Sequence, residues 1–574
     1  MTECPETPTN TRSPLKSFFP FAAISALAVT VYANTAGYTF VFDDLSGILN
    51  PHIIASATSL PQAVRLLGEP WRALTQLSYA LTINIAGTNP RAFHITNILI
   101  HALNSLLVFG IAQHVAGFWM ATTKRELFAL AAASIHAVHP LYSEGVAYVW
   151  GRSSSLCASF YFGALLLVMA GHRSEERRRY LWYSFALVSG LLAWKTKEEA
   201  ITLPFVIAGF FALVGSWRAA GGMVLFPLGL IASRWTDIVG LSVNVRENQS
   251  LVLAGAAPAL DRISYSLTYV KALVLYYLRM FVLPLNQNVD PDIEPVTRVL
   301  DPLFLVSVTV LIMLVVWGVV SARRNRVISF GLVALLASPL LAYLFMPLAD
   351  VVAEHRIYIA GLGFDLVLAS LLTRSGRYGL PILSALVLVL GLMTVQRNQV
   401  WSNSFTLWKD AEQKSPKSAR PHLNLGLAYQ SAGSSDAAVT EYWHALSINP
   451  KLTAAYVNLA GIYFSRNDLT SAESVLKRAA ALSPSLPETY IDLAVIALRR
   501  NRAGEALELL DQAGALDDSY VVHLHRGDAL TQLDRAEDAA REYDQALELR
   551  PDLSELKAQV AERLQKLRQK DAIR

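Results

Sequence analysis

The sequence predicts an all-α protein in two parts: a polytopic membrane bundle of about eleven spans over residues 1–396, then an α-solenoid over residues 397–570. The first observation is composition. The 574 residues are 53% hydrophobic with a mean hydropathy of +0.36, too apolar for an average soluble protein and too many for one domain. The second is charge: residues 1–400 hold 21 Asp/Glu and 28 Lys/Arg, whereas 401–574 hold 24 and 21. The third is a 34-residue period in the tail.

The first apolar run, residues 15–38, is expected to cross the membrane and to remain as an anchor. The segment Val31-Tyr32-Ala33-Asn34 resembles a signal-cleavage site. The run is nevertheless of full spanning length and longer than a typical signal core, which favours a retained anchor.

Ten further apolar runs are long enough to span. A run at 263–285 is interrupted by Lys271 and Arg279, so we expect an interfacial or re-entrant helix there. The spanning runs are 93–116, 127–149, 153–171, 180–195, 199–216, 222–241, 301–321, 328–346, 354–373 and 379–396.

The charges of the connections predict the orientation. One alternate set is basic and includes Arg12 with Lys16, Lys124-Arg125, Arg177-Arg178-Arg179 and Arg323-Arg324-Arg326. By the positive-inside rule that side is cytoplasmic. The other set carries the acids, at Asp43-Asp44, Glu144, Glu198-Glu199, Asp290-Asp292-Glu294 and Asp350 with Glu354. Eleven spans place the N-terminus in the cytoplasm and everything after Arg397 outside it, on the periplasmic side in a bacterium or in the endoplasmic reticulum lumen of a eukaryote.

The tail has the period of tetratricopeptide helix pairs. Pro416, Pro450 and Pro484 are 34 residues apart, and Pro551 lies near the next-but-one multiple. Small residues such as Gly426 recur where paired helices approach closely. We expect a half unit at 401–416, four full units, and a polar closing helix at 552–570. Such arrays bind peptide segments in a concave groove, which makes a protein or peptide acceptor the expected partner, although the array alone specifies no ligand.

Two adjacent carboxylates, Asp43 and Asp44, follow the first span. Charged groups where a chain leaves the bilayer are costly unless they face water or a polar cavity, so they are candidates for function. The alternative is a solvated turn after a first helix.

The second span carries a polar stripe. His94, Asn97, His101 and Asn104 recur at steps of three and four residues and therefore share one helix face. In a membrane helix that face must meet other helices or a cavity, and interhelical hydrogen bonding is the favoured alternative to catalysis. His94 and His101 are two turns apart, too far to share a metal ion without other ligands, so no metal site is expected.

Further polar groups are expected on the same side of the membrane as Asp43. Cations beside an apolar bundle suit the phosphate of a lipid carrier, with anchoring at the interface as the alternative. Glu144 and Arg152 could instead pair with each other. The candidates are His139, Glu144, Arg152, Lys197, Glu198, Glu354, His355, Arg356 and Tyr358.

These segments together resemble the transmembrane and tetratricopeptide-repeat O-mannosyltransferases, within the polyprenyl-phosphate-sugar-dependent membrane glycosyltransferases of GT-C-like fold. The resemblance covers nearly the whole chain. It implies transfer of a monosaccharide, usually mannose, from a polyprenyl-phosphate carrier to Ser/Thr hydroxyls of extracytoplasmic proteins, with Asp43 as the catalytic acid. The repeat array is short, and His355 stands where a Glu-Arg pair is commoner. The segments that carry the resemblance are Phe42-Asp43-Asp44, Phe93-His94 to His101, His139-Pro140 with Glu144, Gly151-Arg152, Lys197-Glu198 and Glu354 to Tyr358.

An inverting transfer needs a base for the acceptor hydroxyl, and Asp43 is the candidate, with Asp44 as a neighbour that orients the acceptor or raises the pKa of Asp43. Lys197, Arg152 and Arg356 would stabilise the leaving phosphate. The lipid-linked donor is a substrate, and no cofactor is expected. A net charge of +4 with basic residues confined to short loops does not suggest nucleic acid. The rivals are a transferase acting on lipid or glycan, and a non-enzymatic membrane-anchored scaffold.

Overall fold

The computed structural model describes residues 14–68, 72–223, 260–343, 348 and 350–573. Those residues are helical and contain no strand. They divide into two compact units, a membrane unit that ends at Ser415 and a repeat unit that begins at Pro416.

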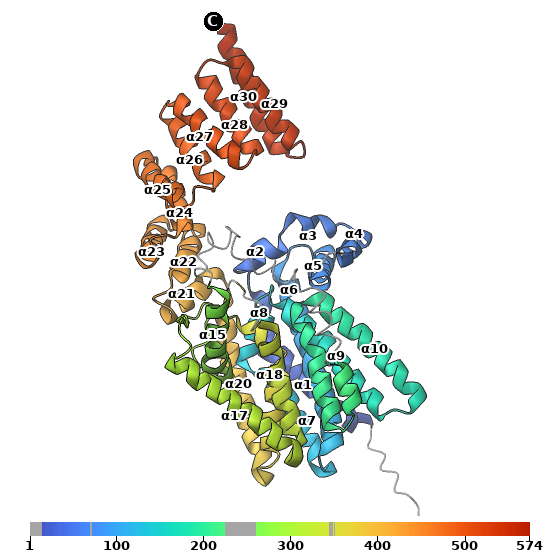
Figure 1. The fold of residues 1–574 in the computed structure, drawn as a ribbon. Helices are drawn as coiled ribbons and strands as arrows, with labels where there is room; N and C mark the ends of the chain where they lie inside the picture. Colours follow the sequence, from blue (N-terminus) through green and yellow to red (C-terminus); the bar gives the residue numbers. More distant parts are fainter. Residues whose placement is uncertain (1–13, 69–71, 224–259, 344–347, 349, 574) are drawn as a thin grey trace, which may run out of the picture. The chain divides into compact units, whose positions relative to one another are not determined.

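The membrane unit is a bundle of long helices with short helices at one end. Figure 1 shows α2, α3, α4 and α5 gathered over the ends of α6, α9 and α10. The helices of this unit are α1 (Pro14–Tyr32), α2 (Asp43–Ile48), α3 (Pro51–Ser56), α4 (Leu60–Arg65), α5 (Ala73–Ala86), α6 (Pro90–Trp119), α7 (Thr122–Val138), α8 (Ser143–Ala147), α9 (Arg152–Arg173), α10 (Glu176–Thr196), α11 (Leu203–Leu213), α15 (Arg262–Ala272), α16 (Arg279–Val282), α17 (Pro302–Arg324), α18 (Arg326–Tyr343), α19 (Gly361–Leu372), α20 (Gly379–Val400) and α21 (Ser404–Lys414), with the π-helical turn η5 (Leu273–Leu278) and the short 3₁₀ turns η1 (Ala33–Gly37), η2 (Leu66–Gly68), η3 (Pro140–Tyr142), η4 (Glu198–Thr202), η6 (Glu354–Ile357) and η7 (Gly376–Tyr378).

Five of the described helical stretches are long and apolar enough to cross a membrane. They are Phe19–Gly37, Pro90–Trp119, Arg152–Arg173, Pro302–Arg324 and Gly376–Val400, and two shorter apolar helices are Arg326–Leu341 and Gly361–Leu372. The chain is therefore a multi-pass membrane protein by these helices. The count of eleven remains a prediction, because the expected span 222–241 lies almost wholly outside the described residues.

Several expected spans differ in extent from the helices that occupy them. The run 127–149 is helical only to Val138, where His139 turns the chain into η3 and α8. The run 354–373 begins as the 3₁₀ turn η6, so that only Gly361–Leu372 is α-helix. The first run thus extends beyond the C-terminal end of α7, and the second begins before the N-terminal end of α19.

The interrupted run 263–285 forms α15, the π-helical turn η5 and α16 in succession. Its two basic side chains are both satisfied by carbonyl groups, since Lys271 donates to Glu294 O and Arg279 donates to Leu275 O. Tyr269 of α15 and Tyr277 of η5 are buried. The placement of this segment as an interfacial or re-entrant helix stays a prediction.

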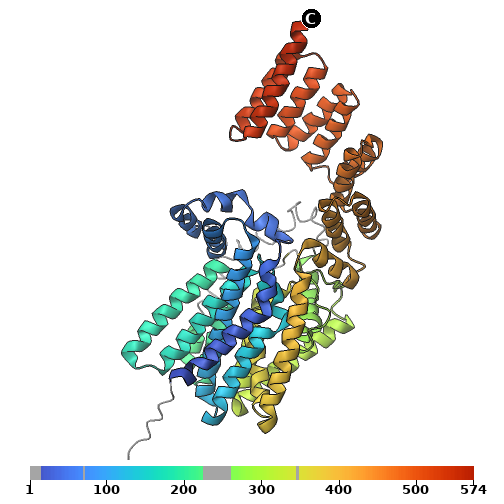
Figure 2. The ribbon, with the colours of Figure 1, turned by 180° about the vertical axis from the view of Figure 1, so that it is seen from behind.

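The first and last long helices of the membrane unit end side by side. Asn34 Nδ2 donates to Val395 O at 3.2 Å, and Asn398 Nδ2 donates to Val31 O at 3.1 Å. Figure 2 shows both α1, in dark blue, and α20, in gold. The loop that follows α1 and the segment that follows α20 therefore leave the bundle at the same end.

The repeat unit consists of four helix pairs and a closing helix that fall where the 34-residue period places them. Helices α22 to α29 pack each against the next in sequence. They are α22 (Ala419–Ser431), α23 (Ser435–Ile448), α24 (Thr453–Ser465), α25 (Leu469–Leu482), α26 (Pro487–Arg499), α27 (Ala503–Leu516), α28 (Tyr520–Gln532), α29 (Ala536–Leu549) and α30 (Ser554–Ile573).

The tight turn inside each pair requires a left-handed backbone. The residues at this turn are Gly433 (φ 77°), Asn467 (58°), Asn501 (56°) and Asp534 (59°). Glycine, asparagine and aspartate are the residues that adopt this conformation most readily. The turn chemistry of all four repeats thus follows from the sequence.

The helix expected to begin the solenoid belongs instead to the membrane unit. Helix α21 covers the predicted half repeat at 401–416, and the division between units comes at Ser415. Trp408 of α21 packs edge-on against Phe42, with ring centroids 5.2 Å apart. The physical reason is that its apolar face has a partner in the loop after α1.

Candidate functional site

Asp43 and Asp44 begin α2, immediately after a backbone distortion. Phe42 has φ 53° and ψ −125°, a conformation that residues with a side chain rarely adopt. Asp44 is fully buried and accepts the backbone N–H of Trp150 at 2.7 Å and that of Val41 at 3.1 Å. These two bonds fix the turn that presents Asp43.

The environment of Asp44 differs from that of its neighbour. Burial raises the pKa of Asp44 to about 7, although the backbone N–H groups of Val41 and Trp150 act in the opposite direction. Asp43 is half-buried and accepts the hydroxyl of Tyr148 at 3.0 Å. Asp44 therefore has the geometry of an anchor, and Asp43 that of the accessible carboxylate.

Aromatic rings surround the Asp43 turn. Tyr148 stacks on Phe42 at 6.0 Å and on Trp401 at 5.1 Å, and it lies 6.4 Å from the ring of His355. Trp401 is buried. Tyr148 consequently contacts both Asp43 and His355 and links the two halves of the site.

Glu144 and His355 form a hydrogen-bonded pair, although they are 211 positions apart. Glu144 Oε1 lies 2.6 Å from His355 Nδ1, and Oε2 accepts the backbone N–H of Glu354 at 2.8 Å. Burial raises the pKa of Glu144 to about 7, with Arg397, the Glu354 N–H and Arg356 opposing it. The Glu144–Arg152 pair considered from the sequence does not form among these described residues.

Positive charges gather around His355. Burial lowers the pKa of His355 well below its usual value, and the charges of Lys197, Arg356 and Arg72 lower it further. The imidazole is therefore neutral at pH 7, and three cations from separate loops lie close enough to influence it.

The three cations differ in their own partners. Lys197 is buried, and its ammonium donates to Glu199 Oε1 at 2.5 Å and to Ser154 Oγ at 2.7 Å. Arg356 is half-exposed and donates to Asp350 O at 2.6 Å. Arg72, whose side chain is 35% exposed, pairs with Glu198 at 3.1 Å. Arg356 and Arg72 are consequently better exposed to an outside anion than Lys197.

Glu198 is fixed as a charged group. Burial alone would raise its pKa, but Arg72 and Lys197 outweigh that effect and lower it to about 2. Its ionised carboxylate holds the Arg72 side chain, whose backbone is in the left-handed region at φ 49°. Glu198 thus positions a cation.

Glu354 is surrounded by donors from the protein. It accepts Tyr276 Oη at 2.7 Å, Gln287 Nε2 at 2.9 Å and Asn288 N at 3.1 Å, and Arg397 Nη2 lies 3.5 Å away. A fully buried carboxylate with these partners organises the loop rather than meeting a substrate.

Arg152, expected from the sequence as a phosphate contact, is fully buried among protein acceptors. Its guanidinium donates to Asn97 Oδ1 at 2.7 Å, to Phe93 O at 3.1 Å and to Thr82 Oγ1 at 3.1 Å. It also lies 4.8 Å above the ring of Tyr79. This geometry makes Arg152 a link between α5, α6 and α9. We therefore do not propose that it contacts the phosphate of the lipid-linked sugar.

The polar stripe of α6 faces other helices. Asn97 Nδ2 donates to Val146 O at 3.1 Å, and His101 Nδ1 lies 2.6 Å from the hydroxyl of Tyr358. His139 Nε2 is 3.0 Å from Phe281 O. His94 is buried against Tyr38. These contacts fix the positions of the segments that carry Glu144 and His355.

Sequence reasoning did not single out several residues that the structure brings into the site: Arg72, Tyr148, Trp401 and Arg397. Tyr148 lies within the motif that carries Glu144. Its contact with Asp43 joins residues 105 positions apart, and no local sequence pattern predicts it. Trp401 directly follows the last span, where an aromatic residue reads as an interface anchor.

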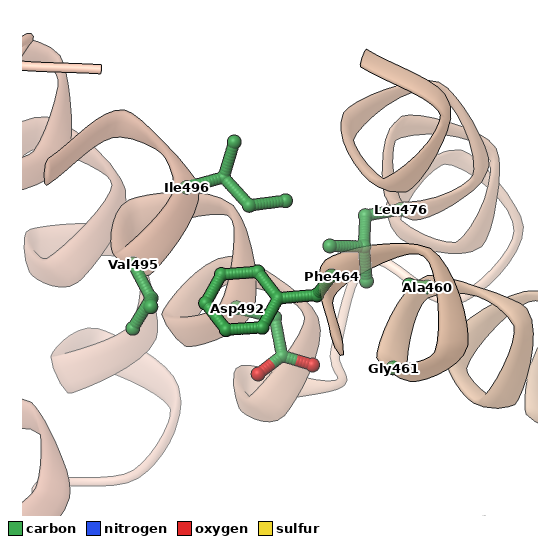
Figure 3. Close-up of a pocket in the computed structure, with 7 residues that line it drawn as sticks. All are labelled: Ala460, Gly461, Phe464, Leu476, Asp492, Val495 and Ile496. Atoms are coloured by element: carbon green, nitrogen blue, oxygen red, sulfur yellow. The ribbon is translucent and has the colours of Figure 1, made fainter. Parts of the chain in front are cut away.

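The repeat unit has a pocket of its own between α24, α25 and α26. A cavity of about 100 Å³ is lined by Ala460, Gly461, Phe464, Leu476, Asp492, Val495 and Ile496. Figure 3 shows the Asp492 carboxylate beside the ring of Phe464. Burial raises the pKa of Asp492 to about 6. An aromatic ring beside a carboxylate suits a peptide side chain with an apolar stem and a polar end.

The tetratricopeptide-repeat profile matches residues 419–452, 463–525 and 521–553. The chain is similar to the Protein O-mannosyl-transferase F38B6.6 of Caenorhabditis elegans, at 24% identity over 74% of this chain and 62% of that protein. It is similar to the human Protein O-mannosyl-transferase TMTC4 at 23% identity, over 75% of this chain and 66% of that protein. The resemblance predicted from the motifs is thereby confirmed.

The matches extend beyond the repeats into the membrane unit, because they cover about three-quarters of the chain. The chain itself spans less than two-thirds of the length of these relatives. A solved tetratricopeptide-repeat protein of Thermus thermophilus also matches, with 20% identity, a TM-score of 0.25, and coverage of 31% of this chain and 94% of that one.

Proposed function

We propose that the chain is a membrane glycosyltransferase that moves a monosaccharide, mannose, from a polyprenyl-phosphate carrier to Ser/Thr hydroxyls of extracytoplasmic proteins. The observation that carries the proposal is the Asp43 turn. An accessible carboxylate is held by its buried neighbour, and Tyr148 connects it to a histidine among three cations. The names of the similar proteins supply the sugar and the class of acceptor.

In the proposed step, Asp43 removes the proton of the acceptor hydroxyl as the oxygen attacks the anomeric carbon of the donor sugar. A new carbon–oxygen bond forms, and the bond from that carbon to the phosphate oxygen breaks. The electron pair leaves with the polyprenyl phosphate, and the configuration at the anomeric carbon inverts. The proton stays on Asp43 until solvent removes it.

The leaving phosphate needs positive charge that is in place before the reaction. Arg356 and Arg72 have the exposure that such a role requires, and Glu198 holds Arg72 in position. Lys197 adds its charge from within the protein, where Glu199 partly neutralises it. We therefore assign donor recognition to Arg356 and Arg72, with Lys197 and Glu198 in support.

Glu144, His355, Glu354 and Tyr358 complete the donor side of the proposal. The neutral imidazole of His355 has one nitrogen at Glu144 and the other available for a hydroxyl of the sugar. Glu354 and Tyr358 fix the loop that carries His355. The repeats are proposed to bind the protein acceptor.

A transferase that acts on lipid or glycan is the second candidate, because nothing in the Asp43 turn distinguishes one hydroxyl from another. A non-enzymatic scaffold would have no need for a strained turn that presents one carboxylate and buries the next.

The test uses the full chain in lipid nanodiscs with polyprenyl-phosphate mannose and a folded extracytoplasmic protein, with mass spectrometry of the product. Wild type should add hexose to Ser or Thr, and Asp43→Asn should not. Glu176→Gln removes an exposed carboxylate at the start of α10, outside the repeats and the proposed site, and should retain full activity. Hexose on lipid alone would support the second candidate, and equal products from Asp43→Asn would overturn the proposed base.

A further inference from the structure

The first helix pair of the repeat unit brings together two imidazoles and a carboxylate. His422 on α22 has Nδ1 2.8 Å from Glu441 Oε2 on α23. His444, one turn further along α23, has Nδ1 4.0 Å from the same oxygen. The ligand atoms of these three residues all lie within 4.8 Å of one another, and the two rings meet at 84° with centroids 5.5 Å apart.

We propose that His422, Glu441 and His444 form a binding site for a divalent transition-metal ion, with Zn²⁺ as the expected occupant. Neutral imidazole and carboxylate are ligands that zinc accepts at about 2.0–2.2 Å, which in a tetrahedron puts ligand atoms roughly 3.4 Å apart. The present separations, from 2.8 Å to at most 4.8 Å, bracket that value. A shift of about 1 Å in one side chain would complete the triad.

The exposure of the three side chains is suited to capture of an ion from solution. His422 and Glu441 are 9% and 14% exposed and hold each other in place, whereas His444 is 59% exposed. Two ligands are therefore preset, and the third can rotate to close on the ion. Three protein ligands leave a fourth position for water, as in zinc sites that remain open.

The fourth repeat supplies an internal comparison. His523 and Glu542 occupy the positions of His422 and Glu441, and they pair at 2.6 Å. The position of His444 is held by Gln545 there. His523 also has its Nε2 3.1 Å from Asp518 Oδ1, and the matching residue of the first repeat is Lys417.

The fourth repeat shows which of these contacts are explained by helix pairing alone. A His–Glu bond between paired helices occurs in both repeats and needs no ion to explain it. The first repeat differs in two positions. It has His444 where the fourth repeat has Gln545, and it has Lys417 where the fourth repeat has Asp518, the acid that contacts Nε2 of His523. In the first repeat, His444 therefore adds a third possible metal ligand to the His422–Glu441 pair.

A bound ion would join α22 to α23 and stabilise the first repeat, because it binds the folded form only. The inference does not depend on the proposed transferase activity, since the site lies wholly within the repeat unit.

The experiment measures zinc binding to the metal-stripped full chain in detergent, with the purification tag removed, by competition with a chromophoric chelator. Wild type should bind one equivalent saturably with a Kd of about 10 μM or tighter. His444→Gln should weaken binding at least tenfold while leaving the helical circular dichroism unchanged, because its side chain is exposed. Co²⁺ should give the visible absorption of a four-coordinate site in wild type and not in His444→Gln.

His523→Gln is the matched control, because it breaks the equivalent His–Glu pair in the repeat that lacks a third ligand. It should leave zinc affinity within twofold of wild type, whereas His422→Gln should abolish tight binding. The proposal is overturned if wild type shows no saturable binding below about 0.1 mM, or if His444→Gln binds zinc as wild type does. Loss of binding in His523→Gln but not in His422→Gln would also overturn it.

Discussion

At the scale of single residues, two adjacent carboxylates have been given opposite environments. Asp44 is buried and bound by two backbone N–H groups, and Asp43 is left half-exposed with a tyrosine hydroxyl as its partner. Phe42, directly before them, has a strained backbone with φ 53° and ψ −125°. The position of the two residues after the first span predicted a functional site. Only their different burial distinguishes Asp43, the proposed base, from Asp44, the anchor of the turn.

Asp43→Asn should lower kcat by about 10²–10⁴-fold, the usual range for loss of a general base. Asparagine can still accept the Tyr148 hydroxyl, so the thermal unfolding temperature should stay within experimental error of wild type. Both are measured on protein in nanodiscs. A mutant with wild-type kcat would show that another group takes the proton.

Asp44→Asn should destabilise the turn instead. Asparagine offers one acceptor oxygen where two N–H groups point, so one buried donor loses its partner at a cost of about 1–3 kcal/mol. The unfolding temperature should fall, and kcat should fall less than in Asp43→Asn. A stable mutant with a lower activity than Asp43→Asn would reverse the assignment of the two residues.

Glu144 should give the activity a dependence on pH near neutrality. Its pKa is raised to about 7 by burial, so the carboxyl gains a proton as the pH falls through that value. Ionised Glu144 accepts from His355 Nδ1, which leaves Nε2 as an acceptor, whereas the protonated acid donates and reverses the tautomer. We expect kcat/KM of wild type to rise as the pH increases through about 7.

Glu144→Gln tests this expectation, because glutamine can accept the Glu354 N–H and donate to His355 at every pH. Its kcat/KM should be low and without the rise near pH 7. Because the folded pKa lies above the ordinary 4.5, wild type should lose stability relative to this mutant as the pH rises from about 4.5 to about 7, by on the order of 3 kcal/mol. Identical pH profiles would exclude Glu144 as the titrating group.

At the scale of elements, α21 connects the segment after the last span to the Asp43 turn. Ser415 Oγ donates to Asp290 O at 2.7 Å, and Asp410 pairs with Arg397 at 3.2 Å. Trp408 packs on Phe42, which precedes the candidate base. Although it directly precedes the repeats in sequence, α21 belongs to the membrane unit.

Two truncations should therefore behave differently. A chain ending at Ser415 keeps α21 and should bind polyprenyl-phosphate mannose as the full chain does. A chain ending at Trp401 loses Trp408, whose burial is worth about 3–5 kcal/mol, and should bind donor weakly or unfold at a lower temperature. Donor binding is measured by the shift in unfolding temperature on adding donor. Equal binding by both truncations would show that α21 is dispensable.

At the scale of the whole molecule, the pairing of chain ends limits the topology. The ends of α1 and α20 meet through Asn34 and Asn398, so the segments that follow them lie on one side of the membrane. An odd number of spans would satisfy this, and the predicted eleven is odd. The placement of the repeats on the same side of the membrane as Asp43 stays a prediction.

A reporter that is active only in the cytoplasm should be silent when fused after Arg574. The same reporter inserted in the basic connection at Arg177-Arg178-Arg179 serves as the positive control, because the positive-inside rule places that loop in the cytoplasm. Activity after Arg574 would contradict the orientation and with it the proposed extracytoplasmic acceptor.

If the repeats bind the protein acceptor, the membrane unit alone should carry out sugar transfer. The chain ending at Ser415 should retain transfer of mannose to a small soluble hydroxyl acceptor but lose modification of intact proteins, because the second binding event is no longer intramolecular. Mass spectrometry of both products measures this. Undiminished modification of protein would leave the repeats with a purely structural role.

The sequence by itself determined the helical class, five of the expected spans, the four repeats, and the acidic pair after the first span. These follow from local periodicity and apolar length. Tertiary structure alone decided that Arg152 is buried among acceptors, that Glu354 organises a loop, that α21 belongs to the membrane unit, and that Glu144 meets His355 at a distance of 211 positions. Burial and pairing depend on which distant segments come together, and a local pattern does not contain that information.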